Sequence, residues 1–223
     1  MCGRFSLYHA EDDVIGRFEV GEADYEFAPR YNVAPSQSIA AVVREGEGRV
    51  LVGLKWGLVP SWAKDPAVGN RMINARAETL AEKPSYRRAL ASRRCLIPAD
   101  GFYEWRKEAR GLKQPMYIRR RDGGLFAFAG LWEEWKGPDG GLLRTSTIVT
   151  VAPNELMRPI HDRMPAILTP EDEARWLDPR SGAAEALPLL RPFPEGELEA
   201  FPVSRAVNSP SVNDPSLIES AGG

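Results

Sequence analysis

Residues 95–106 read CLIPADGFYEWR, and this stretch contains two short runs that decide the expected fold. The first run, Cys95–Pro98, is apolar, and the second, Gly101–Arg106, is rich in aromatic residues. Runs of this length and composition are typical of strands, and they are too short for stable helices. The stretch therefore predicts two consecutive strands in a buried sheet.

The same pattern of short runs continues in both directions along the chain. Nineteen prolines and twenty glycines separate the runs, which favours strands over long helices. Further strands are expected at Gly3–Tyr8, Ile39–Arg44, Arg49–Leu58, Met116–Arg120, Leu125–Trp132, Thr145–Val151, Ala166–Leu168 and Ala200–Val203. Helices are expected at His9–Phe18, Ser85–Ala91, Asn154–Ile160 and Pro170–Leu177, the last capped by Thr169. The pattern predicts one α+β domain with an antiparallel core and a C-terminus, NDPSLIESAGG, that frays.

Composition excludes several classes of protein. The 223 residues are 43% hydrophobic and 27% charged, which suits a folded domain with one core. With only two cysteines and two histidines, neither a disulfide framework nor a zinc cluster is expected, and Cys95 is interpreted as a buried structural thiol. The chain shows no membrane span or signal peptide. We expect a soluble, cytoplasmic monomer without metal or cofactor.

Positive charge is concentrated in the middle of the chain. The net charge is −2, yet Arg71 to Arg121 contains 14 Lys and Arg against 5 Asp and Glu. A basic segment of this kind can line an anion-binding groove, and the tryptophans near it can stack on the bases of a single strand. The alternative is a solvated basic face with the tryptophans in the core.

Cys2 is the strongest candidate for chemistry. Met1 precedes a small residue, so its removal is expected, and Cys2 would then carry a free α-amine beside its thiol. These groups have ordinary pKa values of about 7.7–8.0 and about 8.5, so each is partly nucleophilic near neutral pH. An aldehyde would form a Schiff base with the amine and then a thiazolidine ring with the thiol. The alternative is an ordinary small residue next to the initiator.

Three other segments contain groups suited to a site. His161 lies in RPIHDRMP, where a histidine crowded by charged residues can transfer protons near pH 7. Glu104 lies between two aromatic residues that can desolvate its carboxylate. Asn74 and Arg76 would share one side of an extended MINARAET segment, where they can hold a sugar and a phosphate. An ion pair between Arg76 and Glu78 is the alternative.

Eight motifs together resemble the SOS response-associated peptidase family. In chain order they are MCGRF (1–5), YNVAPSQ (31–37), WGLVPSWAKD (56–65), NARAET (74–79), PADGFYEW (98–105), VTVAPN (149–154), IHDRMP (160–165) and PVSRAVNSP (202–210). The resemblance covers nearly the whole chain, and the central positions show no departure from the family pattern. It implies a single domain over residues 1–223 with a barrel-like, mainly antiparallel β core and short peripheral helices.

The resemblance also implies a function, namely sensing and covalent capture of abasic sites in single-stranded DNA. Cys2 would form a thiazolidine with the ring-opened deoxyribose, assisted by Asn74, Glu104 and His161. The crosslink would shield the strand from cleavage and reverse slowly, and Met1 could be removed by the protein itself. The chain would associate with the nucleoid when bound. The DNA contacts implied in this way are Arg4, Trp62, Arg76, Trp105, Thr150 and Arg163.

Two other functions stay open at this point. An N-terminal-nucleophile amidohydrolase also begins with MCG, but the Asn-Gly segment that builds the oxyanion site in those domains does not occur in this chain. A non-covalent reader of modified DNA bases would use the same groove, and it would not depend on Cys2. A structural α+β protein without selectivity for abasic DNA is the remaining alternative.

Overall fold

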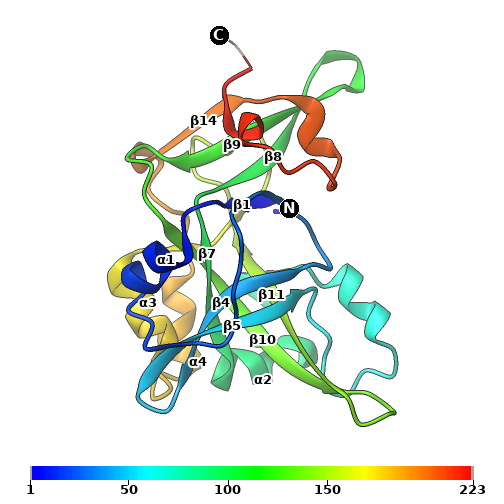
Figure 1. Cartoon of the computed structure of the whole chain (residues 1–223), viewed down its shortest axis with the longest axis vertical. Helices are drawn as coiled ribbons and strands as arrows, with labels where there is room; N and C mark the ends of the chain where they lie inside the picture. The colour runs from blue at the N-terminus through cyan, green and yellow to red at the C-terminus, as the bar shows by residue number, and fades with distance from the viewer. Residues whose placement is uncertain (1, 222–223) are drawn as a thin grey trace.

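The centre of the computed structural model, which describes residues 2–221, is a closed barrel of five strands (Figure 1). Four neighbouring pairs in this barrel are antiparallel, and one parallel pair, β5 with β11, closes the ring. The chain is thus α+β with a barrel core, which confirms the expected fold class. In the order of the ring, the strands are β4 (Ser38–Glu45), β5 (Gly48–Trp56), β11 (Leu142–Val151), β10 (Phe126–Lys136) and β7 (Arg94–Ala99).

The strand β7 is buried along its whole length. One neighbour, β10, comes very close to it at Gly130, which is paired with Cys95. A Cβ atom on residue 130 would lie 2.7 Å from the Cys95 sulfur, so only glycine fits at this crossing. Continuous apolar composition therefore marks β7 as a central strand, in agreement with the expectation for Cys95–Pro98.

A second, fully antiparallel sheet lies above the barrel in Figure 1. The strand β8 (Gly101–Lys107) starts two residues after β7 ends, so the stretch CLIPADGFYEWR connects the two sheets. Behind β8 and its neighbours, Tyr103 and Tyr117 form a small core with Val207 and Leu217. The other strands of this sheet are β14 (Leu198–Pro202), β9 (Lys113–Arg120), β1 (Phe5–Leu7) and β3 (Arg30–Val33).

Short strands extend the barrel sheet, and 3-10 helices connect the longer elements. The two-residue strands are β2 (Glu22–Ala23), β12 (Met164–Pro165) and β13 (Ile167–Leu168), and β6 (Asn74–Arg76) runs parallel to β11. The 3-10 helices are η1 (Pro66–Arg71), η2 (Ala77–Thr79), η3 (Ala109–Gly111), η4 (Leu187–Leu189), η5 (Glu195–Glu197), η6 (Arg205–Asn208) and η7 (Pro215–Ile218).

Four short α-helices lie outside the barrel: α1 (Glu11–Arg17), α2 (Pro84–Ser92), α3 (Pro170–Leu177) and α4 (Ala183–Ala186). Thr169 caps α3, because its hydroxyl oxygen accepts a hydrogen bond from the Asp172 N–H, as expected from the sequence. The buried Arg94 donates to the carbonyls of Leu90 and Trp176, near the C-termini of α2 and α3. Arg94 therefore ties two helices to β7. Within residues 2–221, no helix combines the length and the apolar character needed to cross a membrane.

One expectation about local structure is corrected. The segment Asn154–Ile160 forms hydrogen-bonded turns instead of a helix, because Pro159 lacks the N–H that would continue a helical pattern, although the Asn154 side chain caps the Met157 N–H as at a helix start. The C-terminal segment makes packing and backbone contacts up to residue 221, while its expected fraying stays a prediction. Leu217 is buried, and the Ala221 N–H donates to the Pro202 carbonyl. Gly222 and Gly223 lie outside the described residues.

Candidate functional site

The N-terminal segment brings Cys2 next to β8. Phe5 pairs with Phe102, and the Tyr103 N–H donates to the Arg4 carbonyl at 3.0 Å, so the chain before β1 follows the edge of β8. Cys2 is fully buried in this position, and Glu104 is 2% exposed. Met1, whose removal the sequence predicts, lies outside the described residues.

Asn74 joins this centre from the barrel side. It is the first residue of β6 and is opposite Ile148 of β11. Its Nδ2 atom donates to the Cys2 carbonyl at 2.8 Å, which fixes the backbone of Cys2. The Oδ1 atom of Asn74 is buried and has no hydrogen-bond partner among the described residues. This oxygen can therefore accept a hydrogen bond from a group that enters the site.

His161 approaches Glu104 from the loop that follows β11. Its Nε2 atom lies 3.9 Å from Glu104 Oε2. The Arg163 N–H donates to Nδ1 at 3.0 Å, and this contact places the proton of the neutral ring on Nε2, towards Glu104. In the protonated ring, Nδ1 can instead donate to Asp162 Oδ1 at 2.9 Å. Both protonation states of His161 thus have partners, as a proton-transfer group requires.

The surroundings keep the Cys2 thiol protonated. Burial raises the pKa of this thiol well above its usual range, and the negative charge of Glu104 raises it further. A hydrogen bond with the Arg4 backbone acts in the opposite direction but is a smaller effect. A base must therefore remove the thiol proton when the sulfur attacks a substrate; the charge of Glu104 acts on this thiol, and His161 lies next to Glu104.

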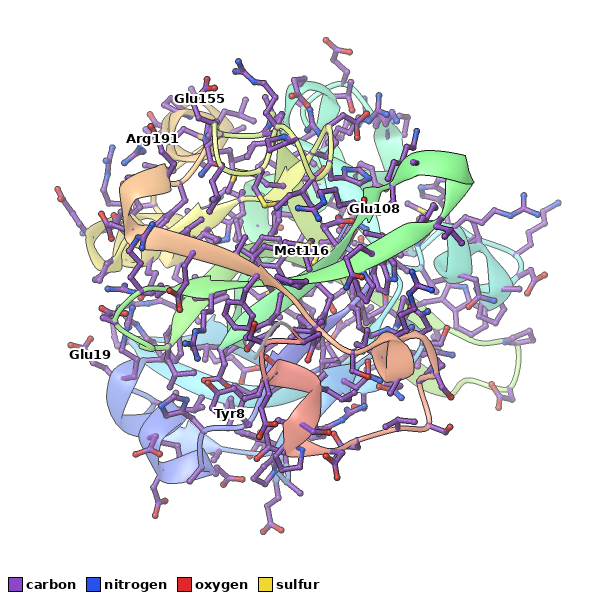
Figure 2. All side chains as sticks on the ribbon, turned by 90° about the horizontal axis from the view of Figure 1, so that it is seen from above. Tyr8, Glu19, Glu108, Met116, Glu155 and Arg191 are labelled. Atoms are coloured by element: carbon purple, nitrogen blue, oxygen red, sulfur yellow. The ribbon has the colours of Figure 1, made fainter. Side chains whose placement is uncertain are left out.

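A cleft of about 800 Å³ opens next to this centre. Glu104, Trp105, His161 and Asp162 form part of its wall, and Lys107, Lys113 and Arg158 provide positive charge. Figure 2 looks onto the second sheet from above. Met116, the cross-strand partner of Glu104, lies near the centre of that view, and Glu155, from the loop that carries His161, lies nearer the edge. The cleft is large enough for a nucleotide-sized ligand.

The residues expected to contact DNA divide into exposed and buried sets. Trp62 is 65% exposed, Arg76 is exposed on β6, and Trp105 lines the cleft. Arg4 and Thr150 are buried, and the Arg4 guanidinium donates to Asn32 Oδ1 at 2.7 Å and to the Val207 carbonyl at 2.6 Å. In this structure Arg4 therefore connects β1 to η6.

Arg163 is engaged by a carboxylate. Its two terminal nitrogens donate to the two oxygens of Glu78 at 2.7 and 2.9 Å, and one of them also donates to the Thr150 carbonyl at 2.6 Å. Glu78 therefore pairs with Arg163, whereas the sequence suggested Arg76 as one possible partner.

Two asparagines near the site were not singled out from the sequence. Asn32 donates through Nδ2 to the carbonyls of Ser209 and Val212 and so holds the C-terminal segment against β3. Asn208 accepts a hydrogen bond from the Trp105 indole N–H at 2.8 Å and fixes the ring beside the cleft. Asn32 lies in the family motif YNVAPSQ and Asn208 in PVSRAVNSP. Their place in these motifs is the sequence feature that could have identified them as residues of the site.

The fold and the site define a small α+β barrel protein in which a buried Cys and Glu and a half-buried Asn and His lie beside a cleft with basic side chains. Residues 1–210 match the model of the family described as SOS response associated peptidase (SRAP). The chain belongs to this family, as the eight motifs predicted.

Relatives and solved structures extend this result. The chain is 52% identical over 223 residues to the abasic site processing protein YoqW of Bacillus subtilis, covering 99% of this chain and 100% of the relative. It is 33% identical to the abasic site processing protein HMCES of Xenopus tropicalis, and the match covers 96% of this chain and 77% of the relative. A crystal structure of a protein from Bacteroides thetaiotaomicron superimposes with a TM-score of 0.90 at 30% identity. The match covers 99% of this chain and 100% of that protein.

Proposed function

We propose that this chain processes abasic sites in DNA and that it does so by covalent capture of the lesion in a single strand through Cys2. The observation that supports this proposal most strongly is the convergence of Cys2, Asn74, Glu104 and His161 on one buried centre. The bacterial and vertebrate relatives that are named abasic site processing proteins support the choice of substrate.

The first step joins the Cys2 α-amine to the aldehyde of the ring-opened deoxyribose. Removal of Met1 frees this amine. It attacks the aldehyde carbon before the thiol does, because burial keeps the thiol protonated. Loss of one water from the adduct gives a Schiff base. His161 in its protonated form, with Nδ1 facing Asp162, can donate the Nε2 proton to the departing oxygen and become neutral, and Glu104 can take up the proton released from the amine.

The second step closes the ring. The Cys2 sulfur adds to the imine carbon, its proton passes through Glu104 to the imine nitrogen, and a thiazolidine forms without further loss of atoms. Asn74 holds the Cys2 carbonyl during both steps, and its free Oδ1 can accept a hydrogen bond from the amine or a sugar hydroxyl. The aldehyde is then no longer available for β-elimination, so the strand is protected from cleavage. The same proton transfers in reverse would reopen the ring slowly.

A denaturing gel with a single-stranded oligonucleotide carrying one abasic site tests this proposal. Wild-type protein that lacks Met1 should give a shifted band, and Cys2→Ala should give none. Cys95→Ala is the matched control, because it removes the other thiol, which is also fully buried but lies in the barrel strand β7. A band of equal intensity from Cys2→Ala would contradict capture by Cys2 and would favour non-covalent or different chemistry.

The origin of the free N-terminus is part of the proposal. Either the chain removes its own Met1, as the family description suggests, or an aminopeptidase does so. Purification of Cys2→Ala and wild type from the same host separates these routes, since alanine also permits aminopeptidase cleavage. Retention of Met1 only in Cys2→Ala would support self-processing, and loss of Met1 from both proteins would contradict it.

A further inference from the structure

The ion pair between Arg163 and Glu78 has a geometry that also fits a phosphate. The guanidinium presents two parallel N–H donors at 2.7 and 2.9 Å from the two carboxylate oxygens. A phosphodiester offers two oxygens with similar spacing and the same single negative charge. The carboxylate therefore occupies the place that a DNA phosphate would take on Arg163.

The two partners differ in how firmly they are held. The Arg163 side chain is 13% exposed, whereas the Glu78 side chain is 54% exposed. Arg163 is fixed further by its bond to the Thr150 carbonyl of β11 and by its backbone contact with His161. Glu78 lies on η2, a single turn of 3-10 helix. A rotation of its side chain can release Glu78 into solvent while Arg163 stays in place.

A second cation lies beside this pair. Arg76 is opposite Thr150 in the pairing of β6 with β11, and it is exposed. Within the described part of the chain, the Arg76 side chain makes no ion pair. Hydrogen bonds from Arg163, together with the charges of Arg163 and Arg76, lower the pKa of Glu78. Glu78 is consequently ionised at neutral pH. Its negative charge partly neutralises the positive charges of Arg163 and Arg76.

We propose that Glu78 closes the DNA contact already expected of Arg163 and Arg76, and that it does so until a DNA phosphate displaces its carboxylate from Arg163. The inference rests on the proposed function and adds a residue that sets DNA affinity. The free energy needed to displace Glu78 from Arg163 offsets part of the free energy gained from the phosphate contact, whatever the DNA sequence. Glu78 therefore weakens non-covalent binding to DNA in general, and retention at a lesion depends more strongly on the chemistry of Cys2.

Binding to an unreactive abasic analogue tests this site without any covalent step. The probe is a fluorescent single-stranded oligonucleotide with one tetrahydrofuran residue, measured by anisotropy at several salt concentrations. Glu78→Gln should bind about fivefold more tightly than wild type, the gain expected when a half-exposed ion pair no longer competes. The slope of log K against log salt should steepen by about 0.7, because Arg163 then exchanges a counterion instead of a carboxylate.

Glu82→Gln is the matched control, because it removes the same charge from an exposed position four residues away. Its affinity should rise less than that of Glu78→Gln. Arg163→Gln combined with Glu78→Gln should cancel the gain. If Glu78 only holds Arg163 in position, Glu78→Gln will bind more weakly than the control, and this result would overturn the proposal. Glu78→Ala repeats the measurement if the glutamine variant has a lowered melting temperature.

The outcomes separate this inference from the proposed function. If no variant binds the oligonucleotide, both are contradicted. If all variants bind and Glu78→Gln shows no gain over Glu82→Gln, only the closing role of Glu78 is contradicted. A gain in Glu78→Gln together with failure of wild type to crosslink reactive abasic DNA would support the phosphate site and contradict capture by Cys2.

Discussion

The two thiols of this chain are both buried, but their neighbours differ. Cys2 lies beside Glu104 and its carbonyl is held by Asn74, whereas burial alone raises the pKa of Cys95. A buried thiol without polar partners is inert, and one beside a carboxylate and a histidine can exchange protons. The sequence could place Cys2 at a reactive terminus, but only the packing shows that its thiol rests in the protonated form.

The Cys95 thiol should make stability depend on alkaline pH. Its folded-state pKa is raised, so its contribution is fully present below the ordinary thiol pKa of about 8.5 and is lost as the pH rises towards the folded value. The free energy of unfolding should therefore fall by about 1.4 kcal/mol per pH unit for this thiol above about pH 8.5. In urea denaturation, Cys95→Ala should be less stable near neutral pH and show a shallower alkaline decline. Equal slopes in both proteins would contradict the account.

Glu104 should control both formation and reversal of the crosslink. Replacement by glutamine keeps the shape of the side chain and removes its capacity to carry a proton. Glu104→Gln should therefore slow both steps by about a hundredfold, the lower end of the range for general acid–base groups. The reversal rate is measured by transfer of protein from an unlabelled to a labelled abasic oligonucleotide. Exchange as fast as in wild type would exclude Glu104 from proton transfer.

At the scale of elements, Arg94 shows how one side chain can organise two helices. Besides the carbonyls of Leu90 and Trp176, its guanidinium donates to those of Asp178 and Ser181 at 2.6 and 2.9 Å. These carbonyls lie at or beyond helix C-termini, where intrahelical partners are absent. The arginine is the first residue of β7, so its position also fixes where the helices meet the barrel.

Replacement of Arg94 by methionine should destabilise the chain by about 3 kcal/mol or more, because several buried carbonyls lose a charged donor. Chemical denaturation followed by fluorescence measures this change. Arg88→Met is the matched control, since Arg88 is exposed on α2 and should change stability by less than about 0.5 kcal/mol. A similar small effect in both variants would show that water satisfies the carbonyls.

Helices and strands with a recognisable local sequence pattern could be predicted. Short strands that exist only because they pair with a distant strand could not. The runs around Cys95–Pro98 and Gly101–Arg106 became β7 and β8, and Thr169 capped α3. By contrast, β12 is two residues long and exists because β11 pairs with it. The turns at Asn154–Ile160 were mistaken for a helix because Asn154 does cap the segment as at a helix start, but Pro159 stops it within a few residues.

At the scale of the whole molecule, both sheets contribute residues to the site. The barrel supplies Asn74 and the loop to His161, and the second sheet supplies Glu104 and lies beside Cys2. The sequence singled out these four residues by their chemistry, and the resemblance to a family assigned them to one site, but their convergence depends on contacts between segments more than fifty residues apart. The pair of Glu78 with Arg163 is of the same kind, and no local pattern could select it.

The contacts of the C-terminal segment predict that it contributes to stability, whereas the sequence alone suggested an end that frays. Leu217 is 1% exposed and packs with Tyr103 and Tyr117 behind the second sheet. Leu217→Ala should cost about 2–3 kcal/mol in thermal or urea unfolding. Leu142→Ala is the control, because Leu142 is 62% exposed and its truncation should be nearly neutral. Equal effects of the two substitutions would indicate that the segment is detached in solution.

The central claim is that Cys2 with a free α-amine captures an abasic site as a thiazolidine. The most direct test is the intact mass of the product formed with a single-stranded abasic oligonucleotide. We predict the mass of the chain without Met1 plus the oligonucleotide minus one water, with the attachment mapped to Cys2. An adduct on a chain that retains Met1, or no adduct from a chain that has lost it, would contradict the account.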